Sequence, residues 1–179
     1  MTMMKRKFFI FLSVFFSFFW MIIRVFLLNK IKFSIVTLVN RKAYLKTFGK
    51  SIIKIGRKTG IKQNVEISAT NANIIIGDDC FINNNCMIIS HKRILIGNKT
   101  TIGPNCCIYD HDHDGYGGYI SKPILIGENV WIGAGSIILK GTTIGNNSVI
   151  GAGSLISKSI PENSIVIQKR ITEIKIRKK

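Results

Sequence analysis

The residues best suited to chemistry in this chain are its three histidines, His91, His111 and His113. Two of them lie in residues 109–119, a stretch that alternates aspartate with histidine and then becomes rich in glycine and tyrosine. An imidazole that titrates near neutral pH can act as a general base, and three imidazoles that meet in space can bind zinc. The stretch therefore predicts a projecting glycine-rich loop that carries either a proton-transfer group or a metal ligand.

The elements that must position these histidines follow from an isoleucine that recurs every six residues, from residue 52 onward. Two residues before the second and third anchor of each triplet stands a small or β-branched residue, so both side chains face inward from one strand. Six residues per side and three sides per coil predict an all-β fold, a parallel β-helix of about five three-sided coils over residues 52–160. The anchors are Ile55, Ile61, Ile67, Ile76, Ile82, Ile88, Ile96, Ile102, Ile108, Ile126, Ile132, Ile138, Ile144, Ile150 and Ile156.

The six-residue spacing fails only between triplets, in the steps 67–76, 88–96 and 108–126. All three steps follow a third anchor, so the additional residues emerge along one edge of the prism. All three histidines lie in these steps. Insertions gathered on one side of a solenoid often form its binding face, so we expect the functional site at this edge.

The chain has four cysteines, none of them in a C-x-x-C pair or at a zinc-ligand spacing from a histidine. The repeat places Cys80, Cys86 and Cys106 at the small inward positions, where they read as packing residues. Cys107 is a candidate acyl-carrying nucleophile, but the sequence offers no evident group to activate it.

Three segments resemble the hexapeptide-repeat acyltransferases, especially the maltose, galactoside and nodulation O-acetyltransferases and the capsule O-acetyltransferases. These segments are residues 126–141, residues 144–158, and Ile108-Tyr109 followed by His113. The resemblance implies a left-handed β-helix, acetyl-CoA as co-substrate, a sugar or glycan hydroxyl as acceptor, and a homotrimer with active sites between neighbouring prisms. It also implies a role in surface polysaccharide or lipid-linked glycan synthesis.

The same resemblance implies the site residues. His113 is the catalytic base, with His111 as its rival, and Asn85 helps to position the acceptor or His113. One of Asp110, Asp112 and Asp114 orients the imidazole, and the sequence does not choose among them. The residues expected along CoA are Trp131, Gly133, Ala134, Gly151, Ala152 and Lys158. The family's Gly-Asn-Pro-Ala segment is replaced here by Ile165–Arg170, so the C-terminal cap departs from the pattern.

The N-terminus has the composition of a membrane-associated helix. Lys5-Arg6-Lys7 precedes an apolar or hydroxyl run over residues 8–23, which Arg24 interrupts before residues 25–28. We expect residues 1–28 to form an apolar helix held at the cytoplasmic face of the bacterial cell membrane through residues 5–28, by shallow insertion or a re-entrant path. A buried core helix is the alternative. Residues 29–51 are then a basic connector, and residues 161–179 a basic C-terminal tail.

The formal net charge of +17 favours anionic partners, namely membrane lipids, nucleic acid or phosphorylated small molecules. Eight of the eleven phenylalanines lie within the first 26 residues, away from most of the charge, which argues against nucleic acid. Two other functions fit the repeat: a metalloenzyme like the γ-carbonic anhydrases, which needs three histidines to meet in space, and a non-enzymatic membrane-bound scaffold.

Overall fold

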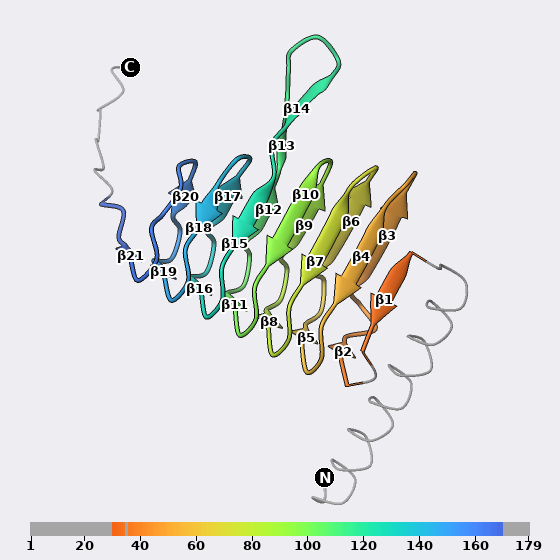
Figure 1. Cartoon of the computed structure of the whole chain (residues 1–179), viewed down its shortest axis with the longest axis horizontal. Helices are drawn as coiled ribbons and strands as arrows, with labels where there is room; N and C mark the ends of the chain where they lie inside the picture. The colour runs from red at the N-terminus through yellow and green to blue at the C-terminus, as the bar shows by residue number, and fades with distance from the viewer. Residues whose placement is uncertain (1–29, 35, 170–179) are drawn as a thin grey trace, which may run out of the picture.

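The protein is an all-β parallel solenoid of six three-stranded coils in the computed structural model, which describes residues 30–34 and 36–169 (Figure 1). Each coil contributes one strand to each side of the prism. The strands, coil by coil, are β1 (Ile31–Phe33), β2 (Leu38–Val39) and β3 (Tyr44–Phe48); β4 (Ile52–Ile55), β5 (Gly60–Ile61) and β6 (Glu66–Thr70); β7 (Asn73–Ile76), β8 (Phe81–Ile82) and β9 (Met87–Ser90); β10 (Arg93–Ile96), β11 (Thr101–Ile102) and β12 (Cys107–Tyr109); β15 (Ile124–Ile126), β16 (Trp131–Ile132) and β17 (Ile137–Leu139); and β18 (Thr143–Ile144), β19 (Val149–Ile150) and β20 (Leu155–Ile156).

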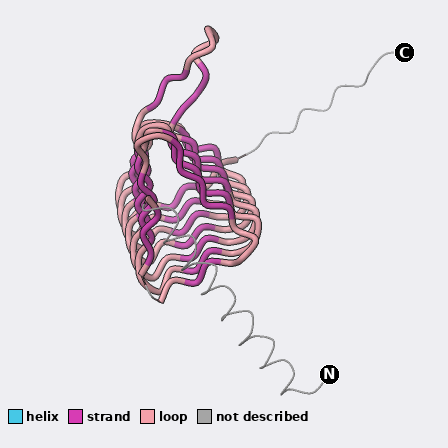
Figure 2. Tube along the Cα trace, turned by 90° about the vertical axis from the view of Figure 1, so that its right-hand side faces the viewer, coloured by secondary structure: helices cyan, strands magenta, loops and turns pink. Residues whose placement is uncertain are grey.

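Three parallel sheets form the sides of the prism. Sheet A has the order β1-β4-β7-β10-β15-β18, and sheet C the order β20-β17-β12-β9-β6-β3. Sheet B has the order β2-β5-β8-β11-β16-β19-β21, where β21 is the additional strand Ile165–Val166. The register repeats without slippage, so that Ile74 pairs with Ile94 and Ile94 with Ile124. Figure 2 shows the coils stacked one behind another, with a single hairpin projecting from one edge.

The core is the predicted isoleucine column. All fifteen anchors are buried, with no more than 3% of any of them exposed. Burying an isoleucine side chain contributes roughly 1.5–3 kcal/mol, so stacking the coils supplies what one coil alone cannot. The prediction that these side chains point inward is confirmed, and with it the three-sided solenoid. The left-handed sense of winding stays a prediction.

The small inward residues also connect one coil to the next. The hydroxyl of Thr59 donates to the carbonyl of Gly77 at 2.7 Å, and the thiol of Cys80 donates to the carbonyl of Gly97 at 3.1 Å. Cys86 and Cys106 donate in the same way to the carbonyls of Gly103 and Gly133, at 3.1 and 3.2 Å. Cys80, Cys86 and Cys106 are thus buried packing residues, as predicted, and each of their thiols donates a hydrogen bond to a corner carbonyl of the next coil.

The solenoid begins earlier than the isoleucine register predicts. Residues 31–48, expected to belong to a connector over residues 29–51, form a complete first coil, so there are six coils rather than five. The reason is that its inward positions include Ile31, Ala43 and Leu45, which are buried without repeating isoleucine at every anchor. The expected start at residue 52 therefore moves to Ile31.

The solenoid also extends into the expected C-terminal tail, because β21 (Ile165–Val166) pairs with β19. The predicted N-terminal helix, residues 1–28, lies outside the described residues. Within residues 30–34 and 36–169, the structure has no helix of the length and apolarity that crossing a membrane requires.

Candidate active site

The histidine-bearing segment is an antiparallel hairpin, β13 (His111–His113) and β14 (Tyr119–Ser121), that projects where sheet C passes into sheet A (Figures 1 and 2). We call this edge, residues 90–93 and 110–122, the histidine corner. Asp114 closes the hairpin tip, since its Oδ1 accepts the backbone N–H groups of Tyr116 and Gly118 at 2.8 and 2.9 Å. Gly115 and Gly117 have φ of 82° and 90°, a conformation that favours glycine. The predicted projecting loop is therefore an ordered hairpin.

Asp110 is the buried anchor of the histidine corner. Its carboxylate has no exposed surface and accepts four hydrogen bonds from residues 90–93, where β9 turns into β10. The donors are the Ser90 hydroxyl at 2.6 Å and the backbone N–H groups of His91, Lys92 and Arg93 at 2.7, 2.9 and 2.7 Å. A carboxylate can accept this many bonds, and charge-assisted bonds are stronger than neutral ones. Asp110 thus fixes the turn that carries His91 to the base of the hairpin.

His91 and His111 are stacked against each other. Their ring centroids are 3.9 Å apart at an interplanar angle of 23°, and Tyr119 meets the His91 ring edge-on at 4.4 Å. The Nδ1 atom of His111 lies 3.5 Å from Oδ1 of Asp110. Burial, and then the adjacent His111, lower the pKa of His91 below its usual range, which favours the neutral imidazole. The pair is held as a compact unit beside a buried carboxylate.

His113, by contrast, is exposed at the far end of β13, where its backbone pairs with Tyr119. Its side chain forms no hydrogen bond or ion pair with any described residue. The Oδ1 atom of Asp112 accepts the His113 backbone N–H, while its Oδ2 accepts from Lys140 Nζ at 3.0 Å. Lys140 thereby lowers the pKa of the Asp112 carboxyl. Among the three candidate aspartates, Asp110 faces His111 and none of them orients the His113 imidazole.

The metalloenzyme alternative needs a cluster of metal-ligating side chains. Within the described part of the chain, no three His, Cys, Asp or Glu residues are grouped so that they could hold a metal ion. Two of the histidines stack face to face, an arrangement that does not direct both ring nitrogens at one point. The geometry therefore gives this alternative no support.

Asn85 lies at a different edge, the corner between sheets B and C, which we call the amide corner. It adopts a left-handed conformation with φ of 60° and belongs to a ladder of amides. Asn64 donates to Asn85, and Asn85 to Asn105, at 3.2 Å each. Within one chain, therefore, the structure does not bring Asn85 together with His113.

The amide corner changes character in the last two coils. Gly135 and Gly153, both with positive φ, occupy the places that Asn85 and Asn105 hold in earlier coils. A side chain built at Gly135 would meet nothing within 4 Å, so the corner is open there. Gly133, Ala134, Gly151 and Ala152 line this open segment, and four of the six residues expected along CoA are thus brought together.

The other two expected CoA residues lie apart from that segment. Trp131 projects from the outer face of sheet B with 58% of its surface exposed, between Thr101 and Val149. Lys158 follows β20 on sheet C, so it stands on the side of the histidine corner. Within one chain, therefore, the six residues predicted to bind CoA do not lie together at a single edge of the prism.

Sequence reasoning missed Ser90 and left Asp110 as one of three choices. A signal was present. Ser90 stands two residues after the anchor Ile88, and Asp110 two residues after Ile108, so both are inward positions in steps where the repeat fails. A polar residue directed inward at such a step indicates a buried hydrogen-bonding group that supports the insertion.

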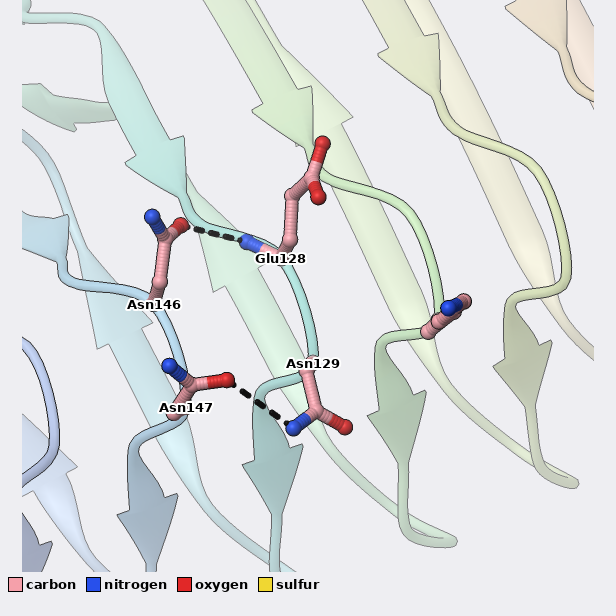
Figure 3. A pocket seen from close by; sticks show the side chains of 5 residues that line it. Glu128, Asn129, Asn146 and Asn147 are labelled. Carbon is pink, nitrogen blue, oxygen red and sulfur yellow. Dashed lines mark hydrogen bonds between the residues drawn. The ribbon is translucent and has the colours of Figure 1, made fainter.

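A polar pocket of about 360 Å³ lies at the third corner, between sheets A and B, and is lined by Lys99, Glu128, Asn129, Asn146 and Asn147 (Figure 3). Its amides are already engaged: Asn146 accepts the backbone N–H of Glu128 at 2.8 Å, and Asn147 accepts from Asn129 at 3.0 Å. No histidine lines it. This pocket is part of the coil-to-coil ladder of amides.

Comparison with known proteins agrees with the repeat. Residues 123–158 match the family model for the bacterial transferase hexapeptide, six repeats. The matched segment runs from just after the hairpin through coils 5 and 6, and it includes six of the fifteen isoleucine anchors. No curated protein matches the sequence.

Solved structures share the fold. AntD, an N-acyltransferase from Bacillus cereus crystallised with dTDP-4-amino-4,6-dideoxyglucose and coenzyme A, superposes with a TM-score of 0.69 at 21% identity, over 83% of this chain and 84% of AntD. PerB from Caulobacter crescentus, in complex with CoA and GDP-perosamine, gives a TM-score of 0.57 at 20% identity, over 73% of this chain. The match spans only 53% of PerB, so this chain corresponds to about half of that protein.

Proposed function

We propose that this hexapeptide-repeat β-helix is a sugar acyltransferase that moves an acetyl group from acetyl-CoA to a sugar hydroxyl. The observation that carries the proposal is a histidine hairpin on one edge of a prism whose other edge opens at the transferase hexapeptide repeats of coils 5 and 6. Two proteins of the same fold, AntD and PerB, were crystallised with coenzyme A and a nucleotide-linked sugar. A surface glycan or its lipid-linked precursor is the acceptor class we propose.

Acetyl transfer to a hydroxyl requires a general base and a thioester carbonyl within reach of the acceptor oxygen. The unprotonated imidazole of His113 accepts the proton of the acceptor hydroxyl, and the hydroxyl oxygen attacks the thioester carbonyl. The tetrahedral intermediate then collapses, the carbon–sulfur bond breaks, and the CoA thiolate takes up the proton from His113. A backbone N–H at a glycine-rich corner can stabilise the developing oxyanion.

Acetyl-CoA suits the open part of the amide corner. There the small residues Gly133, Ala134, Gly151 and Ala152 leave room for an extended chain against the backbone, and Trp131 offers an exposed apolar surface on the adjoining face of sheet B. Asn85 belongs to the same corner, two coils earlier. Lys158, on the opposite side, would reach the phosphates of a CoA molecule bound to a neighbouring copy.

The separation of these parts supports the homotrimer that we propose as the assembly. His113 is exposed on a projecting hairpin, and its side chain forms no hydrogen bond or ion pair with any described residue, whereas a general base must lie within hydrogen-bond reach of its substrate. A second copy that places its amide corner against the hairpin would join His113 to Asn85 and CoA. Site residues would then be shared between copies, which cyclic assemblies allow.

Two histidine variants test the assignment of the base. We expect His113→Ala to lower the acetylation rate by about 10²–10⁴-fold, a typical range for loss of a general base. His111→Phe, which keeps a flat ring against His91, is the matched control and should retain most of the activity. The opposite ranking would assign the base to His111 and Asp110, and full activity in both variants would refute histidine catalysis.

Acylation of a sugar amine is the second candidate, because AntD is an N-acyltransferase and a perosamine N-acetyltransferase shares the fold. The experiment offers acetyl-CoA with either an amino-sugar nucleotide or an oligosaccharide that has only hydroxyls, and follows CoA release by chromatography. Mild alkali removes an ester but leaves an amide. An alkali-stable product formed only from the amine would overturn O-acetylation, and no product from either acceptor would favour a non-enzymatic scaffold.

We also propose that residues 5–28 hold the enzyme at the cytoplasmic face of the bacterial cell membrane, where acetyl-CoA is available and lipid-linked acceptors are assembled. The support is the composition of that segment. Vesicle flotation of the whole protein tests it. Protein that remains unbound with both neutral and anionic vesicles would contradict the proposal.

A further inference from the structure

The positive charge of the repeat domain is concentrated at one end of the solenoid. Coils 1 and 2, residues 30–70, have ten Lys and Arg residues against the single acid Glu66, a net charge of +9. Residues 71–160, which form coils 3 to 6 and the hairpin, have six Lys and Arg residues against six Asp and Glu residues, a net charge of zero. The charge is therefore not a general property of the surface but belongs to the N-terminal third of the prism.

These ten residues surround the prism like a collar, and all of them are exposed. They come from all three sides. Lys32 and Lys54 lie on sheet A, Lys42 and Lys62 at the amide corner, and Lys50 where sheet C passes into sheet A. The remaining members of the basic collar are Lys30, Arg41, Lys46, Arg57 and Lys58.

Little of this charge is neutralised inside the protein. Lys46 pairs with Glu66 at 2.8 Å and Arg57 with Asp78 at 2.9 Å, and these are the only ion pairs of the collar among the described residues. Eight cations are thus left to repel one another at one end of the solenoid. Such a concentration of like charge costs stability through self-repulsion, and a bound anionic partner would offset that cost.

Exposed apolar side chains accompany the cations in the same coils. Val36, Leu38, Tyr44 and Phe48 each expose more than half of their surface, at 56%, 62%, 52% and 54%. A groove of about 490 Å³ lies on sheet B beside Leu38, where Gly60 has no side chain to fill the space between Leu38 and Phe81. Lys58 and Lys62 flank this groove. Cations interspersed with aliphatic and aromatic groups are characteristic of surfaces that lie in the headgroup region of a bilayer.

From these observations we propose that coils 1 and 2 form a docking surface for an anionic phospholipid bilayer, which the solenoid meets with its N-terminal end. A collar that includes all three sides fits a flat partner approached along the solenoid axis. A nucleic acid would instead favour a basic groove with stacked aromatic rings. The surface is separate from the proposed acyl-transfer site, because the hairpin and the open amide corner lie in coils 4 to 6 (Figure 1). Neither feature requires the other.

The test compares vesicles of phosphatidylcholine alone with vesicles that also contain phosphatidylglycerol, using the full-length chain. The measured quantity is the partition coefficient on vesicles with phosphatidylglycerol divided by that on vesicles of phosphatidylcholine alone. Apolar insertion by any other segment contributes to both partition coefficients and therefore cancels from the ratio. The variant replaces Lys32, Lys42 and Lys50 by Gln. Because each cation at an anionic surface contributes about 1 kcal/mol, this variant should lower the ratio roughly 100-fold.

A matched control removes the same number of charges elsewhere, by replacing Lys92, Lys99 and Lys122 with Gln. It should leave the ratio within about threefold of the original, because these lysines lie beyond the collar and the surface potential decays within a Debye length. Far-ultraviolet circular dichroism of both variants establishes that the solenoid remains folded.

Three outcomes would overturn the proposal. In the first, the ratio of partition coefficients does not change in the collar variant. In the second, the ratio falls equally in both variants, which would show an effect of net charge alone. In the third, a single-stranded oligonucleotide displaces the protein from phosphatidylglycerol vesicles at matched charge concentration, which would identify nucleic acid as the better partner. The proposal is supported if the ratio of partition coefficients falls only in the collar variant. Added salt should then lower the same ratio in the original protein.

Discussion

Replacing Asp110 tests whether one buried carboxylate supports the whole histidine corner. Asp110 is fully buried and accepts hydrogen bonds from the Ser90 hydroxyl and from three consecutive backbone N–H groups, those of residues 91–93. Asp110→Ala leaves all four donors without a partner. Asp110→Asn keeps the shape and one oxygen.

The magnitudes follow from these bonds. Hydrogen bonds to a charged group are worth about 1.5–3 kcal/mol each, but the turn can relax and rehydrate, so the four do not add in full. We expect Asp110→Ala to lower the free energy of unfolding by about 4 kcal/mol, near the upper end for single substitutions. In Asp110→Asn the oxygen can still serve Ser90, Lys92 and Arg93, while the amide opposes the His91 N–H, so we expect a loss of about 2 kcal/mol. Ser90→Ala removes a single bond and should cost about 1 kcal/mol.

Urea unfolding at one fixed protein concentration, followed by circular dichroism, measures this series, since assembly would otherwise shift the apparent stability. Asp112→Ala is the control, because Asp112 is exposed and its loss should barely move the midpoint. Acetyl transfer measured in native buffer supplies a second readout, which should fall in the order of the stability losses if Asp110 holds the hairpin in place. An Asp110→Ala protein within about 1 kcal/mol of the original would refute the reasoning, because it would mean that water satisfies the same donors equally well.

Three further substitutions and one titration follow from the same geometry. Gly97→Ala should cost at least about 2 kcal/mol in urea unfolding, because its Cβ would lie 2.5 Å from the backbone carbon of Gly127. Gly135→Asn should be nearly neutral in the same assay, since asparagine tolerates positive φ and its amide would extend the existing ladder; a loss as large as that of Gly97→Ala would contradict this. Cys86→Ser should change stability by less than about 1 kcal/mol, because serine already occupies the equivalent place in coils 5 and 6, and a thiol reagent should modify only the partly exposed Cys107 quickly in the folded protein. The pKa of His91 is lowered in the fold, so the unfolded chain takes up the proton first and stability should fall as pH drops below about 6.5; His91→Gln should flatten that slope between pH 7.5 and 5.5, and an unchanged slope would exclude His91 as its source.

The architecture could be predicted from the sequence because the fold of a solenoid is determined by short repeats along the chain. Each coil contacts only its neighbours, so the period of six and the inward pairs such as Thr59–Ile61 specify the fold without long-range information. The prediction failed at coil 1, where Phe33, Val39 and Leu45 pair with the isoleucine anchors of coil 2 but are not isoleucine themselves. Burial depends on the neighbouring coil rather than on residue identity, so a degenerate repeat is visible only once the coils are stacked.

The candidate site could be predicted from the sequence only in part. The sequence by itself placed all three histidines on the irregular edge, because insertions after every third anchor must emerge at one corner. Only the tertiary structure decided that Asp110 is buried under the turn of residues 91–93, that His91 stacks on His111, and that Asn85 lies at another corner from His113. The physical reason is that periodicity fixes which way a side chain points within a regular strand, whereas the contacts of an insertion depend on hydrogen bonds and packing with residues some 20 positions away in the preceding coil.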